Sequence, residues 1–173
     1  MNANIVKRDF HEVWGDQDDL SVLTFTLGAE TFAIKATMVQ EIIDLLPETL
    51  VPGARPFVSS VINFRGKVIP LADIRLAFGM MPAVATIDSR IIVAEIDMEG
   101  EPILVGIRTD RVYEVTSLTR AASEPPPAIG MRWRADFIDC LVKRGGEFII
   151  LPDLLAIFSH HTERAVLTAA TSS

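Results

Sequence analysis

The feature that most constrains the fold of this chain is an internal repeat, a hairpin followed by a short helix, whose two copies lie 80 residues apart. The copies share a turn glycine, two alternating apolar residues, an aspartate and a phenylalanine. The matched pairs are Gly66/Gly146, Ile69/Ile149, Leu71/Leu151, Asp73/Asp153 and Phe78/Phe158. Alternating apolar residues are typical of strands, glycine accepts positive φ in a tight turn, and aspartate caps helices. The sequence therefore predicts two similar small folding units.

A second match, at an offset of 73 residues, occurs in the same order along the chain. It pairs Ile34 with Ile107, Val39 with Val112 and Glu41 with Glu114. Chance likeness between hairpins is the alternative interpretation of either match alone. Taken together, the matches predict one domain over 20–160, with a lead-in at 1–19 and a tail at 161–173. Within the domain we expect two lobes, at about 20–83 and 90–158.

Short apolar runs separated by turn residues predict an all-β fold with short helices, in which closed barrels remove exposed sheet edges. Proline and glycine punctuate the chain, and the run 123–127 contains three prolines that exclude a regular element. Four hairpins are expected, at 21–34, 58–71, 90–107 and 136–151. Helical segments are expected at 35–43, 74–78 and 153–158.

Composition excludes several classes of function. The net charge is −7 and the pI about 4.9, and the main basic grouping is 132–134 with 143–144 nearby, so nucleic-acid binding is not expected. Charged residues interrupt every apolar run before it reaches the roughly 18 residues of a membrane span. Residues 1–19 lack the apolar core of a signal peptide, and Cys140 is the single cysteine. We therefore expect a cytoplasmic protein with protein partners.

Only one segment suggests enzymatic chemistry. The run 145–148, Gly-Gly-Glu-Phe, is similar to most of the active-site signature of diguanylate cyclases. That signature needs a second acidic residue, and the chain lacks room for the α/β domain of those enzymes. The three histidines lack metal-ligand spacing, and common nucleotide, hydrolase and zinc motifs are absent. We expect no enzyme activity, no catalytic residues, no cofactor and no metal.

One charged pair stands out, because Glu41 and Arg65 belong to the same predicted lobe. Two solvated charges would contribute little to stability even if they paired. The alternative is a pair that fixes the shape of a docking surface beside the apolar side chain of Val39. The sequence alone leaves both interpretations open.

These residues carry a resemblance to the CheW family of bacterial chemotaxis adaptors. The central hairpin at 61–75 is the most specific match, and the resemblance covers about residues 20 to 160. The other matching segments are 25–28, 32–34, 39–42, 51–52, 56–57, 129–130, 137–138 and 150–153, with Ile107, Asp110, Val112 and Val115.

The resemblance implies two five-stranded Src-homology-3-like barrels and a non-enzymatic scaffold. Such a scaffold couples the cytoplasmic tips of methyl-accepting chemoreceptors to the regulatory domain of a CheA-type histidine kinase. It is recruited to membrane-associated receptor arrays without inserting into the membrane. A receptor helical hairpin would dock in a groove between lobes, and lobe ends would accept the kinase domain. The resemblance assigns docking to Ala36, Val39, Glu41, Asn63, Arg65, Gly66 and Val112.

The sequence departs from the family pattern at three positions. Ser60 and Cys140 stand where glycine is frequent, and Phe64 stands where leucine is usual. Ser60 and Phe64 lie near the expected docking surface. The departures leave open an adaptor of a non-swimming pathway, such as surface sensing, twitching or gliding.

Overall fold

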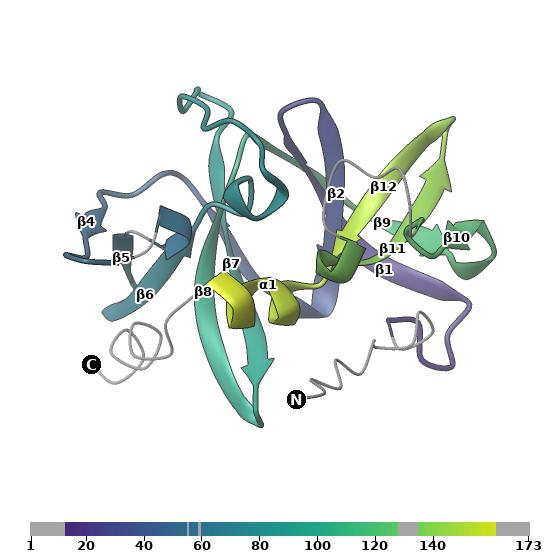
Figure 1. Ribbon diagram of the computed structural model, residues 1–173, viewed down its shortest axis with the longest axis horizontal. Helices are drawn as coiled ribbons and strands as arrows, with labels where there is room; N and C mark the ends of the chain where they lie inside the picture. Colours follow the sequence, from purple (N-terminus) through teal and green to yellow (C-terminus); the bar gives the residue numbers. More distant parts are fainter. Residues whose placement is uncertain (1–12, 55, 59, 128–134, 162–173) are drawn as a thin grey trace, which may run out of the picture.

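The computed structural model describes residues 13–54, 56–58, 60–127 and 135–161, which form two curved antiparallel-rich sheets with one α-helix between them (Figure 1). One sheet has the strand order β10-β11-β12-β2-β1-β9, and the other has the order β3-β7-β8-β6-β5-β4. We call the first sheet the terminal barrel, because it uses both ends of the domain, and the second the central barrel.

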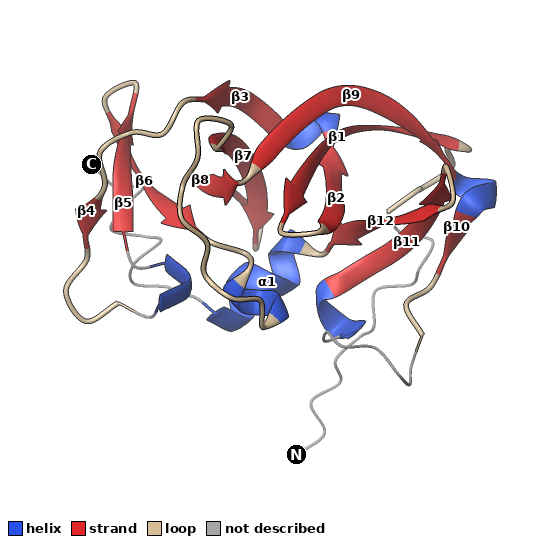
Figure 2. Ribbon diagram, turned by 90° about the horizontal axis from the view of Figure 1, so that it is seen from above, coloured by secondary structure: helices blue, strands red, loops and turns tan. Residues whose placement is uncertain are grey.

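The elements follow one another as short strands joined by tight turns and 3-10 helices (Figure 2). The terminal barrel contains β1 (Asp19–Leu27), β2 (Glu30–Lys35), β9 (Arg111–Thr119), β10 (Ser123–Glu124), β11 (Ile138–Arg144) and β12 (Glu147–Pro152). The central barrel contains β3 (Val39–Ile43), β4 (Thr49–Leu50), β5 (Ser60–Phe64), β6 (Lys67–Ala72), β7 (Arg90–Met98) and β8 (Glu101–Thr109). The helical elements are η1 (Ala36–Met38), η2 (Pro56–Val58), η3 (Leu76–Phe78), η4 (Arg120–Ala122), η5 (Ala135–Phe137) and α1 (Leu154–His161).

The two sheets repeat the same pattern: adding six to each strand number of the central barrel, with the count restarting after β12, gives the order of the terminal barrel read from its other end. Strands of one sequence repeat pair with strands of the other through two parallel pairings of matching register. Leu71 of β6 lies opposite Gly106 of β8, and Ile150 of β12 lies opposite Phe32 of β2. Each barrel therefore combines the first two strands of one sequence repeat with the last four of the other.

This exchange corrects the predicted lobes. The segments 20–83 and 90–158 are repeat units in sequence, but β1 and β2 pair with β9 and β12 rather than with β3–β8. The physical reason lies in the connections β2–β3 and β8–β9, which pass from one barrel to the other. The all-β class and the two-barrel architecture are confirmed. Each sheet has five longer strands, as expected, plus one two-residue edge strand, β4 or β10.

The largest buried cluster lies where the barrels meet, and it joins strands of both sheets with α1. Phe25, Phe32, Phe78 and Phe158 are among its buried aromatic side chains. Each barrel also has a smaller interior cluster of its own. Because apolar burial is the main favourable term in folding, the barrels are stabilised chiefly as one unit.

Two local predictions need correction. The segment 35–43 is not a helix: η1 covers three residues, and β3 follows with alternating exposure. β-Branched residues dominate β3, and its pairing with β7 outweighs the helical spacing of its apolar residues. The helix expected at 74–78 is the 3-10 turn η3, which ends as predicted at Gly79 with φ +66°.

The helix after the second hairpin is confirmed and is longer than expected. The Asp153 carboxylate accepts a hydrogen bond from the Ala156 N–H at 3.0 Å, which is the contact of an N-cap. Most of the predicted lead-in, the end of the tail and the basic group at 132–134 lie outside the described residues.

Candidate docking surface

The tip of the β5–β6 hairpin is a two-residue turn in which both central residues have positive φ. Arg65 has φ +50° and Gly66 has φ +80°. The Asn63 side-chain oxygen accepts a hydrogen bond from the Gly66 N–H at 3.0 Å and braces the turn. This pattern belongs to the mirror-image turns whose twist matches that of a hairpin. The predicted roles of Asn63 and Gly66 as turn-shaping residues agree with this geometry.

Arg65 occupies a backbone conformation that favours glycine, which it shares, among the non-glycine residues of the described part of the chain, with Glu99 of the β7–β8 turn. The left-handed region costs a residue with a Cβ roughly 1–2 kcal/mol. The repeat-equivalent position in the β11–β12 turn is Gly145, with φ +59°. The same turn therefore forms without an arginine, and its presence at this strained position points to a role for its side chain.

The Arg65 side chain bridges the hairpin to strand β3. Its Nη2 lies 2.8 Å from Glu41 Oε2, and its guanidinium lies 5.3 Å from the centroid of the Phe64 ring. The Arg65 side chain is 73% exposed and that of Glu41 is 34% exposed. Exposed ion pairs contribute at most about 1 kcal/mol to stability. The pair that the sequence singled out therefore exists, and it places a positive and a negative charge side by side at one end of the central barrel.

Val39 and Ala36 lie on the chain segment that enters this end of the central barrel. Val39 begins β3, lies opposite Ala94 of β7, and packs half-buried against the cluster between the barrels. Ala36 belongs to η1 rather than to a docking helix. A β-bulge separates the pairing of Val39 from that of Glu41. The apolar and charged parts of the predicted surface thus share one short strand.

Val112 lies on the other barrel. It is the second residue of β9, lies opposite Phe25 of β1, and packs half-buried against the same central cluster. It is the repeat-equivalent of Val39. The structure therefore brings Glu41, Asn63, Arg65 and Gly66 together around one end of the central barrel. Val112 has the position in the terminal barrel that Val39 has in the central barrel.

A groove of about 440 Å³ lies between the barrels beside α1, on the side of η1. It lies next to Ala36 in the chain, but it does not include Val39 or Val112. Its lining comes from five parts of the chain: Val13, Ala33, Ile34, Lys35, Thr37, Met38, Glu95, Ile96, Asp97, Asp139, Leu151, Pro152, Asp153, Leu154 and Leu155. Ile34, Leu151 and Asp153 stood out in the sequence as repeat positions, but none of the lining residues was predicted to bind a partner. The repeat alignment of residues around 37 and 155 is the signal that could have identified the groove.

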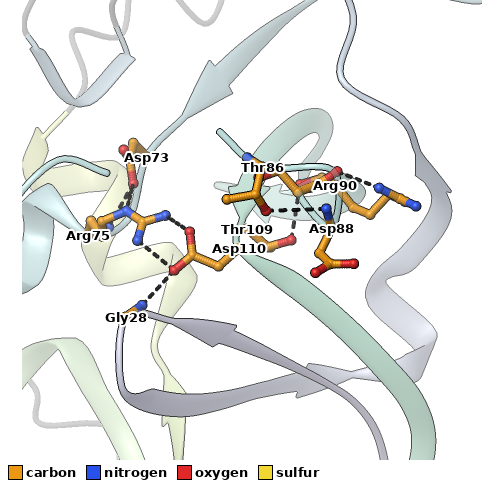
Figure 3. A network of polar contacts seen from close by, with 9 residues as sticks. Gly28, Asp73, Arg75, Thr86, Asp88, Arg90, Thr109 and Asp110 are labelled. Atoms are coloured by element: carbon orange, nitrogen blue, oxygen red, sulfur yellow. Dashed lines mark hydrogen bonds and ion pairs between the residues drawn. The ribbon is translucent and has the colours of Figure 1, made fainter. Parts of the chain in front are cut away.

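A buried arginine bridges the barrels at another place (Figure 3). Arg75, whose side chain is 3% exposed, makes two hydrogen bonds to the Asp110 carboxylate, one of them at 2.9 Å, and also lies 3.4 Å from Asp73. Asp110 Oδ2 accepts a further hydrogen bond from the Gly28 N–H at 2.7 Å. The hydrogen bonds from Arg75 hold the pKa of Asp110 below its ordinary value, whereas burial raises the pKa of Asp73. This network joins turns from both barrels.

Catalytic chemistry finds no support in the described residues. They contain no group of three or more His, Cys, Asp or Glu side chains placed to hold a metal ion. Gly145 and Gly146 form a hairpin turn, and Glu147 begins β12 at an exposed position. Burial raises the pKa of Cys140 to about 12, which leaves the thiol protonated and unreactive. None of the helices that the structure describes has the length and hydrophobicity to span a membrane.

Comparison with known proteins decides the family. The CheW-like domain matches residues 21–162. The chain belongs to the CheW-like family. A probable chemotaxis protein CheW of Rhizobium etli is 29% identical over 150 residues, covering 87% of this chain and 94% of the relative. The chemotaxis protein CheW of Klebsiella aerogenes is also 29% identical, with 87% and 88% covered.

A solved structure supports the same assignment. The scaffolding protein CheW of Thermoanaerobacter tengcongensis superposes with a TM-score of 0.74 at 28% identity, covering 84% of this chain and 92% of that protein. The CheW-like chain described here is accordingly a non-enzymatic scaffold of chemotaxis signal transduction.

The three departures from the family pattern have local structural roles. Ser60 is buried, and its hydroxyl donates to Glu48 Oε2 at 3.2 Å, while Glu48 also pairs with Arg108. Phe64 supports the Arg65 guanidinium. Cys140 is fully buried in the interior of the terminal barrel. Only Phe64 touches the candidate docking residues.

Proposed function

We propose that this protein couples the cytoplasmic tips of chemoreceptors to a CheA-type histidine kinase by binding both non-covalently. The end of the central barrel, formed by Glu41, Asn63, Arg65 and Gly66, accepts the regulatory domain of the kinase. The neighbouring segment with Ala36 and Val39, together with Val112, contributes to receptor docking. Through the receptor, the protein is recruited from the cytoplasm to membrane-associated arrays.

The observation that carries this proposal is the backbone conformation of Arg65. The terminal barrel makes the same turn with Gly145, so the arginine is not needed for the turn itself. Its ion pair with Glu41 is too exposed to account for the strain through added stability. A charged, largely exposed side chain at a barrel end supports a role in recognition, where charge complementarity gives specificity and speeds association.

The test is a titration of the full chain against the CheA-type regulatory domains and receptor tips encoded in the same genome. We expect binding at about micromolar affinity, as is ordinary for a reversible scaffold. Glu41→Ala and Arg65→Ala should each weaken kinase binding about tenfold, and Val39→Asp should weaken receptor binding selectively. Arg144→Ala is the matched control, because Arg144 flanks the turn of the other hairpin and bonds Thr116 at 2.7 Å.

Two results would count against the proposal. Loss of kinase binding in step with loss of thermal stability in Arg65→Ala would assign the arginine a structural role. Absence of binding of the wild-type chain to every kinase domain and receptor tip would mean that this fold serves other partners.

A further inference from the structure

The tip of the β5–β6 hairpin contains a contact that a regular strand cannot make. Phe64 ends β5, and Arg65 follows it in the chain. Successive side chains of a strand point to opposite faces, so neighbours in sequence do not meet. The left-handed backbone at Arg65 breaks this alternation, and its guanidinium lies over the Phe64 ring, 5.3 Å from the centroid. This is within the roughly 6 Å over which an aromatic face attracts a cation.

The Phe64 ring is fixed in turn by the interior of the central barrel. Phe64 is 9% exposed and belongs to a buried cluster whose other members are Ile62, Ile69, Leu71, Ile91 and Val93. The Arg65 side chain, by contrast, is 73% exposed. The guanidinium therefore rests on a ring that closely packed neighbours keep in place, while most of the arginine side chain remains open to solvent.

The ion pair with Glu41 does not by itself orient the guanidinium. Arg65 Nη2 and Glu41 Oε2 lie 2.8 Å apart, yet Oε2 is shielded from solvent and accepts no hydrogen bond from the described residues. The N–H bonds of Arg65 therefore do not point at this oxygen, and the contact is an attraction of charges without the direction of a hydrogen bond. This leaves N–H donors of the guanidinium available to acceptor oxygens of another molecule.

The equivalent hairpin tip of the terminal barrel is built differently. The 80-residue repeat places Arg144 at the position of Phe64 and Gly145 at the position of Arg65. Arg144 donates a hydrogen bond to the Thr116 hydroxyl at 2.7 Å. Of the two hairpin tips, the central one alone combines an exposed arginine with a buried ring beneath it.

We infer that Phe64 is a positioning residue for kinase binding: its ring holds the Arg65 guanidinium so that the available N–H groups donate to acceptor oxygens of the kinase regulatory domain. The inference rests on the proposed function, because it takes that domain as the partner of the hairpin tip. Phe64 acts through Arg65 and needs no contact of its own with the kinase. A guanidinium that is already oriented loses less conformational freedom on binding, so the ring strengthens the complex.

Calorimetric titration of the full chain with the kinase regulatory domain tests the coupling between the two residues. Phe64→Leu keeps an apolar side chain but removes the aromatic face, and it should weaken binding about fivefold. In an Arg65→Ala background the same substitution should have no further effect. Ile62→Val, in the same buried cluster, is the matched control and should bind like the wild type. Wild-type affinity in Phe64→Leu, or equal weakening in both backgrounds or in the control, would overturn the inference.

Nuclear magnetic resonance of the wild type provides a second test that does not depend on a folded variant. The ring current of Phe64 should move the Nε–H signal of Arg65 upfield of that of the exposed Arg144, and coincident signals would contradict the inference.

Failure of the inference and failure of the proposed function give different results. A wild-type chain that binds no kinase regulatory domain would refute the coupling role itself. A wild-type chain that binds, with a Phe64→Leu variant that binds equally well, would refute the positioning role alone.

Discussion

The two barrels have the same strand order and differ at their hairpin tips. The central barrel places Arg65 at a position with φ +50°, whereas the terminal barrel places Gly145 at the equivalent position with φ +59°. The turn with Gly145 has neither the steric strain of a Cβ atom nor a charged side chain. The two barrels thus share their architecture and differ in the charge that this tip presents, and the proposed recognition role rests on that difference.

The barrel interiors differ as well. In the terminal barrel, Trp14 enters the interior cluster from ahead of β1 and packs with Cys140. At the repeat-equivalent position of Cys140, the central barrel has Ser60, which bonds Glu48, the partner of Arg108. The buried cluster of the central barrel comes entirely from its own strands β5, β6 and β7. The interior of the terminal barrel is thus filled in part by a residue from outside its strands. In the central barrel, the equivalent position makes a polar contact with the segment before β4.

The largest expected effect tests the role of Trp14. Trp14 is 2% exposed, so Trp14→Ala should remove about 3–5 kcal/mol from the free energy of unfolding through lost burial and a new cavity. Urea unfolding measures this, with Trp14→Phe as the milder control. A loss below about 1 kcal/mol would show that the terminal barrel is stable without its tryptophan.

The second-largest effect is expected from removing the Arg75 ion pairs that join the two barrels. Arg75→Met leaves Asp110 and Asp73 without their cation in a largely buried place and should cost about 3 kcal/mol. The matched control is Leu155→Met at the repeat-equivalent position, which conserves volume and should cost less than about 1.5 kcal/mol. Equal unfolding free energies for the two variants would contradict the stabilising role of the Arg75 ion pairs.

A smaller effect is expected from the substitution that makes the two hairpin tips alike. Arg65→Gly should raise the unfolding free energy by about 1 kcal/mol, because glycine relieves the left-handed strain. The same variant should lose kinase binding. Thermal unfolding and the kinase titration together separate the two effects, and unchanged kinase affinity in this more stable variant would remove the recognition role of the tip.

The smallest effect concerns acid stability. The pKa of Asp110 is lowered by Arg75, so its contribution to stability is present above about pH 4, the unfolded value, and is lost as pH falls through the folded value. The raised pKa of Asp73 acts in the opposite direction, because protonation there favours the folded state. Asp110→Asn should flatten the acid limb of the stability profile below about pH 4. A profile identical to the wild type would show that the network does not control acid stability.

Much of the local structure could be predicted because its causes are local. The turn glycines, the period-2 apolar runs and the Asp153 cap act over a few residues, and each predicted its element. The sequence singled out Glu41 and Arg65 but left open whether they pair, because the contact joins β3 to the tip of the central hairpin. The helix predicted at 35–43 failed because Met38, Val39 and Ile42 satisfy a helical spacing, while the pairing of β3 with β7 is a distant contact.

The exchange of strands between barrels could not be predicted from the repeat. The repeat shows that two segments are alike, but it does not show whether β2 pairs with its own unit or with the other. That choice depends on the crossing connections β2–β3 and β8–β9 and on close packing at Gly106. A Cβ at this glycine would lie 3.2 Å from side-chain carbons of Ile91 and Leu71. The groove escaped prediction because its lining comes from segments that are far apart in the sequence.

The most direct test of the coupling role is co-sedimentation of the kinase with receptor-bearing membranes, with and without this protein. The account predicts that the kinase sediments with the membranes only when the protein is present. It also predicts that Arg65→Gly abolishes this effect while Arg144→Ala preserves it. Sedimentation of the kinase that is independent of the protein, or retained in Arg65→Gly, would contradict the claim that this barrel end joins kinase to receptor.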